Sequence, residues 1–508
     1  MQEQNLFCGS SSVGRALASQ AKGRGFEPRL PLKHNNLTYF FVCNTVAIMA
    51  VVLLAIMLGG LLIIATEPLN HISKAAVAMF AGVCCWLLYI AQGNNFVSSQ
   101  HAADYAIYLA DNSLQAHSIK DFIASNIFFN YVVKGANIVL FLIATTSIVE
   151  ILNNNGCFDF AAEWMRTRKP RKLLWLLFIF TFVLSANLDN LATVVLMLTI
   201  MHPVLQSDKQ RRIYGTVIVL AANCGGAITV IGDITSLRLW NDQLVTPSTY
   251  FLTLVMPMIA AAITMLTLLA RSLPPRVELS LDRLPFRGDD TVLTRPQRLL
   301  MLLVGIGGLW FIPSFHRITL LPPFVGALCV LALLWIVNEL CNRQLLGSDK
   351  MVAKRMPLAL QYANLQNLLY YVGLTLMLGA VAETGVLQHI ATWLLSHIGN
   401  IWILGGITTV LASLFGNIPT LLASTEVFGH LSGEWSHLTA CNGTLWPLIS
   451  YTTALGGSVL LTGSVAGMLL MRMEGISFGW YLRHIAPKVL TGTAVGYIVL
   501  LAQSLVMG

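Results

Sequence analysis

The sequence predicts an all-α polytopic membrane protein with about 10–12 membrane segments, arranged as inverted repeats with re-entrant hairpins and broken helices. The first observation is composition: of 508 residues, 56% are hydrophobic and only 11% are charged. The mean hydropathy is +0.70, which is too apolar for a soluble globular protein. The second observation is that runs of roughly 20 apolar residues, long enough to cross a bilayer core, recur along the chain. The third is that polar clusters interrupt several of these runs.

The first 36 residues differ from the rest of the chain. They are polar and basic, glycine-rich from Gly9 to Arg29, and lack the apolar core of a signal peptide. The stretches Gly9–Ala16 and Gly25–Arg29 resemble a translated transfer-RNA gene. We therefore interpret residues 1–36 as a disordered or spurious leader, with initiation near Met49 or at a non-Met start shortly before it.

Two membrane repeats are predicted after the leader. The first covers residues 37–270, the second covers 297–508, and the basic, proline-containing stretch 271–296 links them. The apolar segments are expected at about 40–66, 74–92, 127–152, 173–205, 213–240, 250–270, 297–313, 319–340, 365–382, 399–423, 443–471 and 485–506.

Basic residues flank both ends of the broken segment 173–205. Arg166–Lys172 precedes it and Asp208–Arg212 follows it, and clusters of Lys and Arg favour the cytoplasmic side. Because both ends favour the same side, we predict a re-entrant hairpin with its tip at Asn187 to Asn190. Segment 213–240 then crosses outward as a broken helix, with its interruption expected at Asn223 to Gly226. The loop at about 93–126 has no basic excess and is expected outside.

The second half repeats this plan in the opposite orientation. Segment 399–423 is a predicted hairpin whose flanks lack Lys and Arg, so it should enter from outside. In the broken helix 443–471, Gly456-Gly457 repeats Gly225-Gly226 at an offset of 231 residues. Two similar halves of opposite orientation are typical of secondary transporters, which bind their substrates where the broken helices meet.

The interruptions carry the candidate chemistry. A charged side chain at membrane depth costs roughly 2.5–3.5 kcal/mol, so Asp189 and Asp233 indicate an ion path and are the predicted Na⁺ ligands. Hard cations prefer oxygen ligands, and half-helix ends add partial charges. The predicted ion-binding and coupling residues are Asp189, Asn190, Asn223, Asp233, Thr235, Asn417, Ser458 and Ser464. Two structural alternatives stay open: the glycine pairs could serve close helix packing, and the carboxylates could cap half-helices.

Glu150 and Glu383 occupy similar places in the two halves. Each is a candidate proton carrier, and each is equally compatible with a solvated position at the end of its span. The chain contains no Walker loop, HExxH or GxSxG motif, so an enzyme is not expected. The net charge is +8. The Lys and Arg residues that produce it lie in short loops between apolar segments, where they set the orientation in the membrane, so nucleic-acid binding is not expected.

The strings Leu188–Asn190, Ala221–Gly226, Ile231–Thr235, Gly456–Ser458 and Gly463–Ser464 resemble the NhaD-type sodium/proton antiporters of the ion transporter superfamily. The resemblance extends over roughly residues 40–506. It implies exchange of Na⁺ or Li⁺ for H⁺ in the cytoplasmic (inner) membrane and a homodimer with scaffold and transport domains that move in an elevator-like manner. The chain departs from the family at Gly416, where an aspartate is usual.

These observations predict a cation/proton antiporter in which Asp189, alone or with Asp233, alternately binds Na⁺ and H⁺. Burial favours the neutral acid and a bound cation favours the carboxylate, so the two ions compete for one site. No cofactor is expected beyond the transported ions, and the expected partners are small cations and the lipid bilayer. Two alternatives remain: an anion carrier of the same fold for arsenite or a carboxylate, and a non-transporting membrane scaffold or sensor.

Overall fold

The computed structural model describes residues 36–111, 119–279, 293–343, 365–429, 431 and 435–507. The predicted leader, except its last residue, and residues 280–292 of the predicted linker lie outside the described residues. Within the described ranges every regular element is a helix, and one isolated β-bridge joins Leu205 to Leu279. The predicted all-α fold class is confirmed.

Eight described helices are long and apolar enough to cross a membrane, counting α7–η2–α8 and α15–η4–α16 as one helix each. They are α2 (Asn36–Ala65), α4 (Lys74–Ala91), α7–η2–α8 (Ile119–Asn154), α14 (Pro247–Ala270), α15–η4–α16 (Arg295–Thr319), α17 (Pro323–Cys341), α20 (Leu365–Ala382) and α28 (Ala486–Met507). Each of these corresponds to a predicted apolar segment.

The other four predicted segments are pairs of shorter helices separated by a break. The two hairpins are α10 (Pro170–Ser185) with α11 (Asn190–Met201), and α22 (Ile401–Phe415) with α23 (Asn417–Phe428). The two broken helices are α12 (Asp208–Gly226) with α13 (Ile234–Asn241), and α25 (Leu445–Val459) with α26 (Val465–Glu474).

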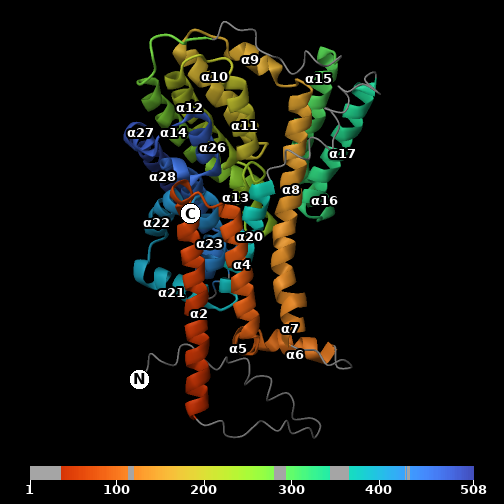
Figure 1. The fold of residues 1–508 in the computed structure, drawn as a ribbon, viewed down its shortest axis with the longest axis vertical. Helices are drawn as coiled ribbons and strands as arrows, with labels where there is room; N and C mark the ends of the chain where they lie inside the picture. The colour runs from red at the N-terminus through yellow and green to blue at the C-terminus, as the bar shows by residue number, and fades with distance from the viewer. Residues whose placement is uncertain are drawn as a thin grey trace.

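Short helices connect these elements. They are α3 (Glu67–Asn70), α5 (Gly93–Gln100), α6 (Ala102–Asp111), α9 (Asp159–Met165), α21 (Val386–Ile398), α24 (Ser436–Thr439) and α27 (Phe478–His484). The stretch treated as a loop at about 93–126 is therefore largely helical where it is described. In Figure 1, α5 and α6 lie across the end of the molecule opposite α9.

The position of the interruption in the first broken helix differs from the prediction. Helix α12 continues through Gly225 and Gly226, and the break covers residues 227–233 instead of Asn223 to Gly226. In the second half α25 likewise continues through its glycine pair to Val459. Glycine weakens a helix only by about 1 kcal/mol per residue, so in a packed segment it does not by itself end the helix.

Polar contacts show that the first hairpin enters and leaves on one side. The hydroxyl of Tyr214 in α12 donates to the carbonyl of Pro170 at the start of α10 (3.3 Å). Arg211, one turn earlier in α12, donates to the carbonyl of Leu205, just beyond α11 (3.1 Å). The start of α10 and the end of α11 therefore both lie beside the start of α12.

The two broken helices run in opposite directions. Beyond α13, the Leu244 carbonyl accepts from the backbone N–H of Asn442, just before α25 (2.9 Å). At the other end, Glu474 at the end of α26 pairs with Arg211 at the start of α12 (3.0 Å). Helix pair α25–α26 thus begins where α12–α13 ends, which is the antiparallel arrangement of an inverted repeat. The exact boundaries of the two repeats stay a prediction.

The helices pack in two main groups (Figure 1). In one group α4 packs along α20 and α2, and α8 packs against α17 and α20. In the other group α14 packs along α28, α22 along α25, and α10 along α12. The two hairpins and the two broken helices all belong to the second group, which therefore contains the predicted site.

Candidate functional site

Asp189 lies at the tip of the first hairpin and is the N-cap of α11. One carboxylate oxygen, Oδ2, accepts hydrogen bonds from the backbone N–H groups of Leu191 and Ala192, both at 3.2 Å. The other oxygen, Oδ1, is buried and has no hydrogen-bond partner among the described residues. The capping alternative is thus correct for one oxygen, while the second oxygen remains available for a ligand.

Asp233, at the N-terminus of α13, likewise has one hydrogen-bonded carboxylate oxygen and one without a partner in the described part of the chain. Its Oδ2 accepts from the hydroxyl of Thr235 (2.8 Å) and from the side-chain amide of Asn417 (3.4 Å). Its Oδ1 is buried without a hydrogen-bond partner among the described residues. Because Asn417 opens α23 of the second hairpin, this contact joins the two halves of the chain.

Ser464 takes the place of Asp233 in the second half. The backbone angles are φ −141° and ψ 153° at Asp233, and φ −141° and ψ 151° at Ser464. The Ser464 hydroxyl caps α26 by accepting from the backbone N–H of Gly467 (3.0 Å). The two positions therefore share one local structure, but the second half supplies a neutral hydroxyl where the first supplies a carboxylate.

A chain of amide and hydroxyl groups connects the two broken helices at their crossing point. The amide nitrogen of Asn190 lies 3.4 Å from the Asn223 amide oxygen, and the Asn223 amide nitrogen donates to the hydroxyl of Ser458 (2.8 Å). The backbone carbonyl of Ser458 accepts from the Tyr481 hydroxyl (2.7 Å). This chain fixes α12 against α25 beside both carboxylates.

The glycine pairs allow close packing between helices, and they also lie against the interruptions of the broken helices. A Cβ atom on Gly456 would lie 2.6 Å from the backbone carbonyl oxygen of Thr409 in α22, so this glycine allows close helix packing. A Cβ atom on Gly457 would lie 2.7 Å from the carbonyl oxygen of Gly463, across the break of the same helix pair. In the first half Gly225 lies against Phe182 of α10 and Gly226 against Gly232 in the same way.

All eight predicted ion-binding residues are buried. Their exposed fractions range from 1% for Asn223 and Thr235 to 7% for Asn190. Asn417, Ser458 and Ser464 lie between these values. Asp189 and Asp233 are near enough to interact electrostatically. Within the described part of the chain no group of three or more His, Cys, Asp or Glu side chains could hold a metal ion. Two carboxylates among amide and hydroxyl oxygens form an all-oxygen ligand set of the kind that hard cations prefer.

The two glutamates predicted as proton carriers lie elsewhere. Glu383 follows α20 and accepts from the Tyr131 hydroxyl (2.8 Å), and its other oxygen lies 2.5 Å from His101 Nε2. It lines a cavity of about 1040 Å³ between α6 and the first part of α7–η2–α8. Glu150 is half-buried near the C-terminal end of α8. Their roles in proton transfer stay predictions.

Two buried cations near the site were missed by sequence reasoning. Arg238 in α13 is fully buried and pairs with Asp242 (2.6 Å) and with Glu426 of α23 (3.0 Å). Lys74 is 5% exposed, and its ammonium group lies 4.9 Å from the Tyr370 ring centre. Two features of the sequence could have indicated these buried cations. Arg238 stands four residues before Asp242, and Lys74 is the first residue of an apolar segment.

Lys74 also lines a small cavity beside the second hairpin. The cavity wall includes Gly416, Asn417 and Ser464, which are the second-half counterparts of Asp189, Asn190 and Asp233. A cation thus lies next to the half of the site in which both carboxylates are replaced by neutral residues.

Comparison with known proteins places this site in a family. A family model described as citrate transporter (CitMHS) matches residues 45–348. Sodium/proton antiporter 2 of Arabidopsis thaliana is 28% identical over 454 residues, covering 88% of this chain and 97% of that protein. Sodium/proton antiporter 1 of the same plant is 30% identical over 374 residues, covering 72% and 62%.

A bacterial relative carries the name predicted from the motifs. The Na⁺/H⁺ antiporter NhaD of Vibrio parahaemolyticus is 26% identical over 360 residues, covering 66% of this chain and 82% of that protein. The predicted resemblance to NhaD-type antiporters is confirmed. Because the family model matches more than half of the chain, including the first hairpin and the first broken helix, the chain belongs to the citrate transporter (CitMHS) family.

Proposed function

We propose that this multi-pass membrane protein is a secondary active transporter that exchanges Na⁺ or Li⁺ for H⁺. The observation that carries the proposal is the pair of buried carboxylates, Asp189 and Asp233, each with one oxygen free of hydrogen bonds to the described residues where two antiparallel broken helices meet. The relatives named as sodium/proton antiporters support it.

The two free carboxylate oxygens explain how exchange becomes obligatory. Leaving two like charges buried and unpaired is expensive, so the empty, doubly ionised site is disfavoured. Either protons or a cation can neutralise the site, and binding of one reduces binding of the other. The Oδ2 atoms are already held by the α11 backbone, Thr235 and Asn417, so the Oδ1 atoms are the ligand positions.

An anion carrier is the second candidate, and the citrate transporter description of the matching family model is the observation that favours it. A tricarboxylate requires cationic or N–H groups at its site. Two carboxylates converge between the broken helices with amide and hydroxyl groups. Of the two buried cations nearby, Arg238 already pairs with Asp242 and Glu426. The other, Lys74, lies over the Tyr370 ring beside the second hairpin, so we favour cation exchange. A non-transporting membrane scaffold or sensor is the third candidate.

One assay separates these functions. Everted membrane vesicles that contain the protein are acidified by respiration, and dequenching of a ΔpH-sensitive dye is followed after addition of Na⁺, Li⁺ or K⁺. We expect dequenching with Na⁺ and Li⁺, and its loss in Asp189→Asn, because the amide cannot exchange a proton for a cation. Asp208→Asn is the matched control, since Asp208 is exposed at the start of α12.

Full Na⁺-dependent dequenching in Asp189→Asn would refute the assignment of this residue. A wild-type protein without any cation-dependent dequenching, but with citrate or arsenite uptake, would refute cation exchange in favour of an anion carrier. If the wild-type protein transports none of these ions, the result would favour the non-transporting scaffold or sensor.

The proposal includes three further features. The transporter acts in the cytoplasmic membrane, functions as a homodimer, and needs no cofactor besides the transported ions. The many exposed apolar side chains of α16 and α17, such as Trp310, Phe311 and Ile336, offer a membrane-buried face for the second copy or for lipid. Cross-linking of single-cysteine variants on α17 within native membranes would detect the dimer.

A further inference from the structure

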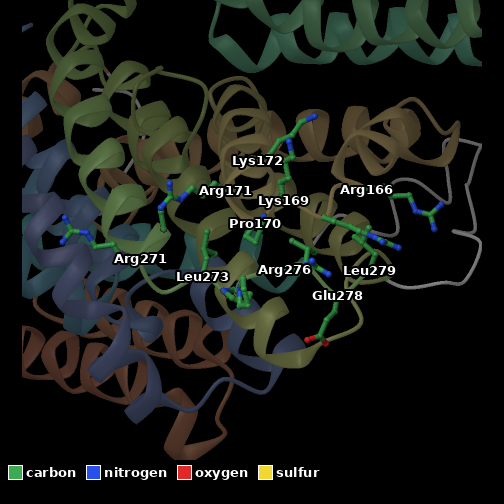
Figure 2. A pocket seen from close by; sticks show the side chains of 15 residues that line it. Arg166, Lys169, Pro170, Arg171, Lys172, Arg271, Leu273, Arg276, Glu278 and Leu279 are labelled. Carbon is green, nitrogen blue, oxygen red and sulfur yellow. The ribbon is translucent and has the colours of Figure 1, made fainter.

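A strongly basic pocket lies at the end of the molecule where α10 begins and α14 ends (Figure 2). It has a volume of about 1390 Å³ and lies between residues 166–172 and residues 270–279. Among the described residues that line it, Glu278 is the one acidic residue, and many are basic, among them Arg168, Lys169, Arg171, Lys172, Arg271 and Arg276. The position of α10 on the cytoplasmic side follows from its basic flank.

Hydrogen bonds hold the two walls of this basic pocket together. Gln210 of α12 is 3% exposed, and its amide donates to the Arg276 carbonyl (3.1 Å) and accepts from the Glu278 backbone N–H (3.0 Å). The backbone N–H of Val277 donates to the Arg168 carbonyl (3.3 Å). Helix α12 therefore holds both walls, because Gln210 binds residues 276–278 and Tyr214, one turn later, donates to the Pro170 carbonyl (3.3 Å). Orientation in the membrane requires basic residues, but it does not require that two distant basic segments be held face to face in this way.

The positive charge of the pocket is not compensated by the described part of the chain. None of the six basic residues named above forms an ion pair with a described carboxylate. In Figure 2 the Glu278 carboxylate extends away from Arg171 and Lys172. These two residues also lie in the first turn of α10, where the partial positive charge of the helix end disfavours cations. A bound anion with several negative charges would relieve this repulsion.

An apolar surface extends from the basic pocket along α10 toward its C-terminal end. Arg171, Trp175, Ile179 and Val183 follow one another at intervals of four residues, so they lie along one face of α10. The three apolar side chains are 38%, 55% and 53% exposed. Val183 also lines a second, mainly apolar cavity of about 500 Å³, together with Phe158, Leu303 and Trp310. A charged end and an apolar path in this order match the two parts of a phospholipid.

We propose that the basic pocket binds a phosphate-bearing anion and that its ligand is the headgroup of an anionic phospholipid, with the acyl chains along Trp175, Ile179 and Val183. Arginine side chains bind phosphate through paired hydrogen bonds, and basic pockets on the cytoplasmic side of membrane proteins attract anionic headgroups. Because the pocket joins α10 of the first hairpin to the end of α14, a bound lipid would connect the hairpin to its neighbouring helices.

The test uses the full chain in a neutral detergent, titrated with cardiolipin and followed by native mass spectrometry. We expect the wild type to retain cardiolipin and Arg271→Gln/Arg276→Gln to bind it about thirtyfold more weakly, since each basic residue contributes to the attraction. Lys209→Gln/Arg483→Gln removes the same charge from exposed residues outside the pocket and should bind as the wild type does. Phosphatidylcholine should not compete.

Three outcomes would overturn the proposal. Equal cardiolipin affinity in the wild type and in Arg271→Gln/Arg276→Gln would show that the pocket is not the site. Displacement of cardiolipin by an equal concentration of pyrophosphate would show a soluble phosphate ligand instead of a lipid. If the first variant does not fold, Arg168→Gln/Lys172→Gln tests the opposite wall, and unchanged binding there would also refute the site.

Discussion

At the scale of single residues, Gly416 decides what the second hairpin can contribute. It is the N-cap of α23, the place that Asp189 occupies in α11, and its backbone has φ 103° and ψ 158°. This region of backbone space is accessible essentially to glycine alone. The aspartate that the resemblance led us to expect at this position would therefore not fit the backbone conformation, and a side-chain change alone cannot place a carboxylate at the tip.

Replacement of Gly416 by alanine tests this reasoning. A Cβ atom would have ordinary space, with the nearest atom at 3.5 Å, so the cost should come from the backbone and reach about 1–3 kcal/mol of unfolding free energy. Gly406→Ala is the control, because Gly406 is helical in α22 and no atom lies within 4 Å of the position that its new Cβ atom would take. Denaturant unfolding in detergent that gave equal stability for both variants would contradict the strained conformation.

His101 and Glu383 form a pH-dependent contact outside the membrane segments. The hydrogen bond to Glu383 raises the pKa of His101 above its usual value, and Asp104 adds to the effect while partial burial opposes it. A raised folded-state pKa means that protonation of His101 stabilises the contact. This stabilisation is fully present below the unfolded-state pKa of about 6.5 and is lost as the pH rises through the folded-state pKa.

We therefore expect His101→Gln to lower the thermal unfolding temperature near pH 5 more than near pH 8. His484→Gln, at an exposed position in α27, should lower it equally at both pH values. Thermal scans across this pH range measure the difference. A His101→Gln effect that is constant with pH, or larger at alkaline pH, would show that the ion pair with Glu383 does not form.

At the scale of elements, the breaks depend on backbone contacts that only glycine permits. Gly456 brings α25 against the backbone of α22, and Gly225 brings α12 against the backbone of α10. Each hairpin is thus fixed to the broken helix of its own half. The crossing contact between Asn223 and Ser458 then joins the halves (2.8 Å), so the geometry of the site depends on both glycines.

Gly456→Ala should separate α22 from α25 and reduce exchange activity. The new methyl group would lie 2.6 Å from the Thr409 carbonyl oxygen, and relief of such overlap costs about 1–3 kcal/mol. Gly59→Ala in α2 is the control, since nothing lies within 4 Å of a Cβ there. Dequenching in vesicles and unfolding temperature should both fall only for Gly456→Ala; normal values for both would contradict the close approach.

At the scale of the whole molecule, the inverted arrangement places opposite ends of the broken helices on opposite sides of the membrane. Lys209 opens α12 at the basic end, whereas the exposed Cys441 lies just before α25 at the other end. The distribution of Lys and Arg predicts that the basic end is cytoplasmic. Cys441 is therefore expected on the outer surface.

A membrane-impermeant maleimide added to intact cells should label a variant that keeps Cys441 as its single cysteine. A cysteine-free chain with Lys209→Cys should be labelled only after the cells are opened. Labelling of both variants from the outside would contradict antiparallel broken helices, and the reversed pattern would show that the orientation rule fails for this chain.

The sequence by itself determined the fold class, the positions of the apolar segments and which four of these segments are interrupted. The hydrocarbon core offers no hydrogen bonds to backbone groups and does not solvate charges. Membrane-spanning segments are therefore recognisable in a sequence by their length, and interruptions by the polar residues within them. It also singled out Asp189 and Asp233 as candidate ion ligands, because ionisable side chains are rare inside such segments; the structure buries both, and their role in ion binding stays a prediction. The glycine pairs were recognised, but their position within helices, before the breaks, was not.

Only the tertiary structure showed which carboxylate oxygens lack hydrogen bonds to the described residues, which basic side chains are buried and how the two halves of the chain contact each other. Three contacts join residues that are distant in sequence: the pairing of Arg238 with Glu426, the position of Lys74 beside Gly416, and the hydrogen bond from Val277 to Arg168 between two basic segments. Such contacts depend on the relative positions of packed helices, and sequence periodicity carries no information about which faces of distant helices touch.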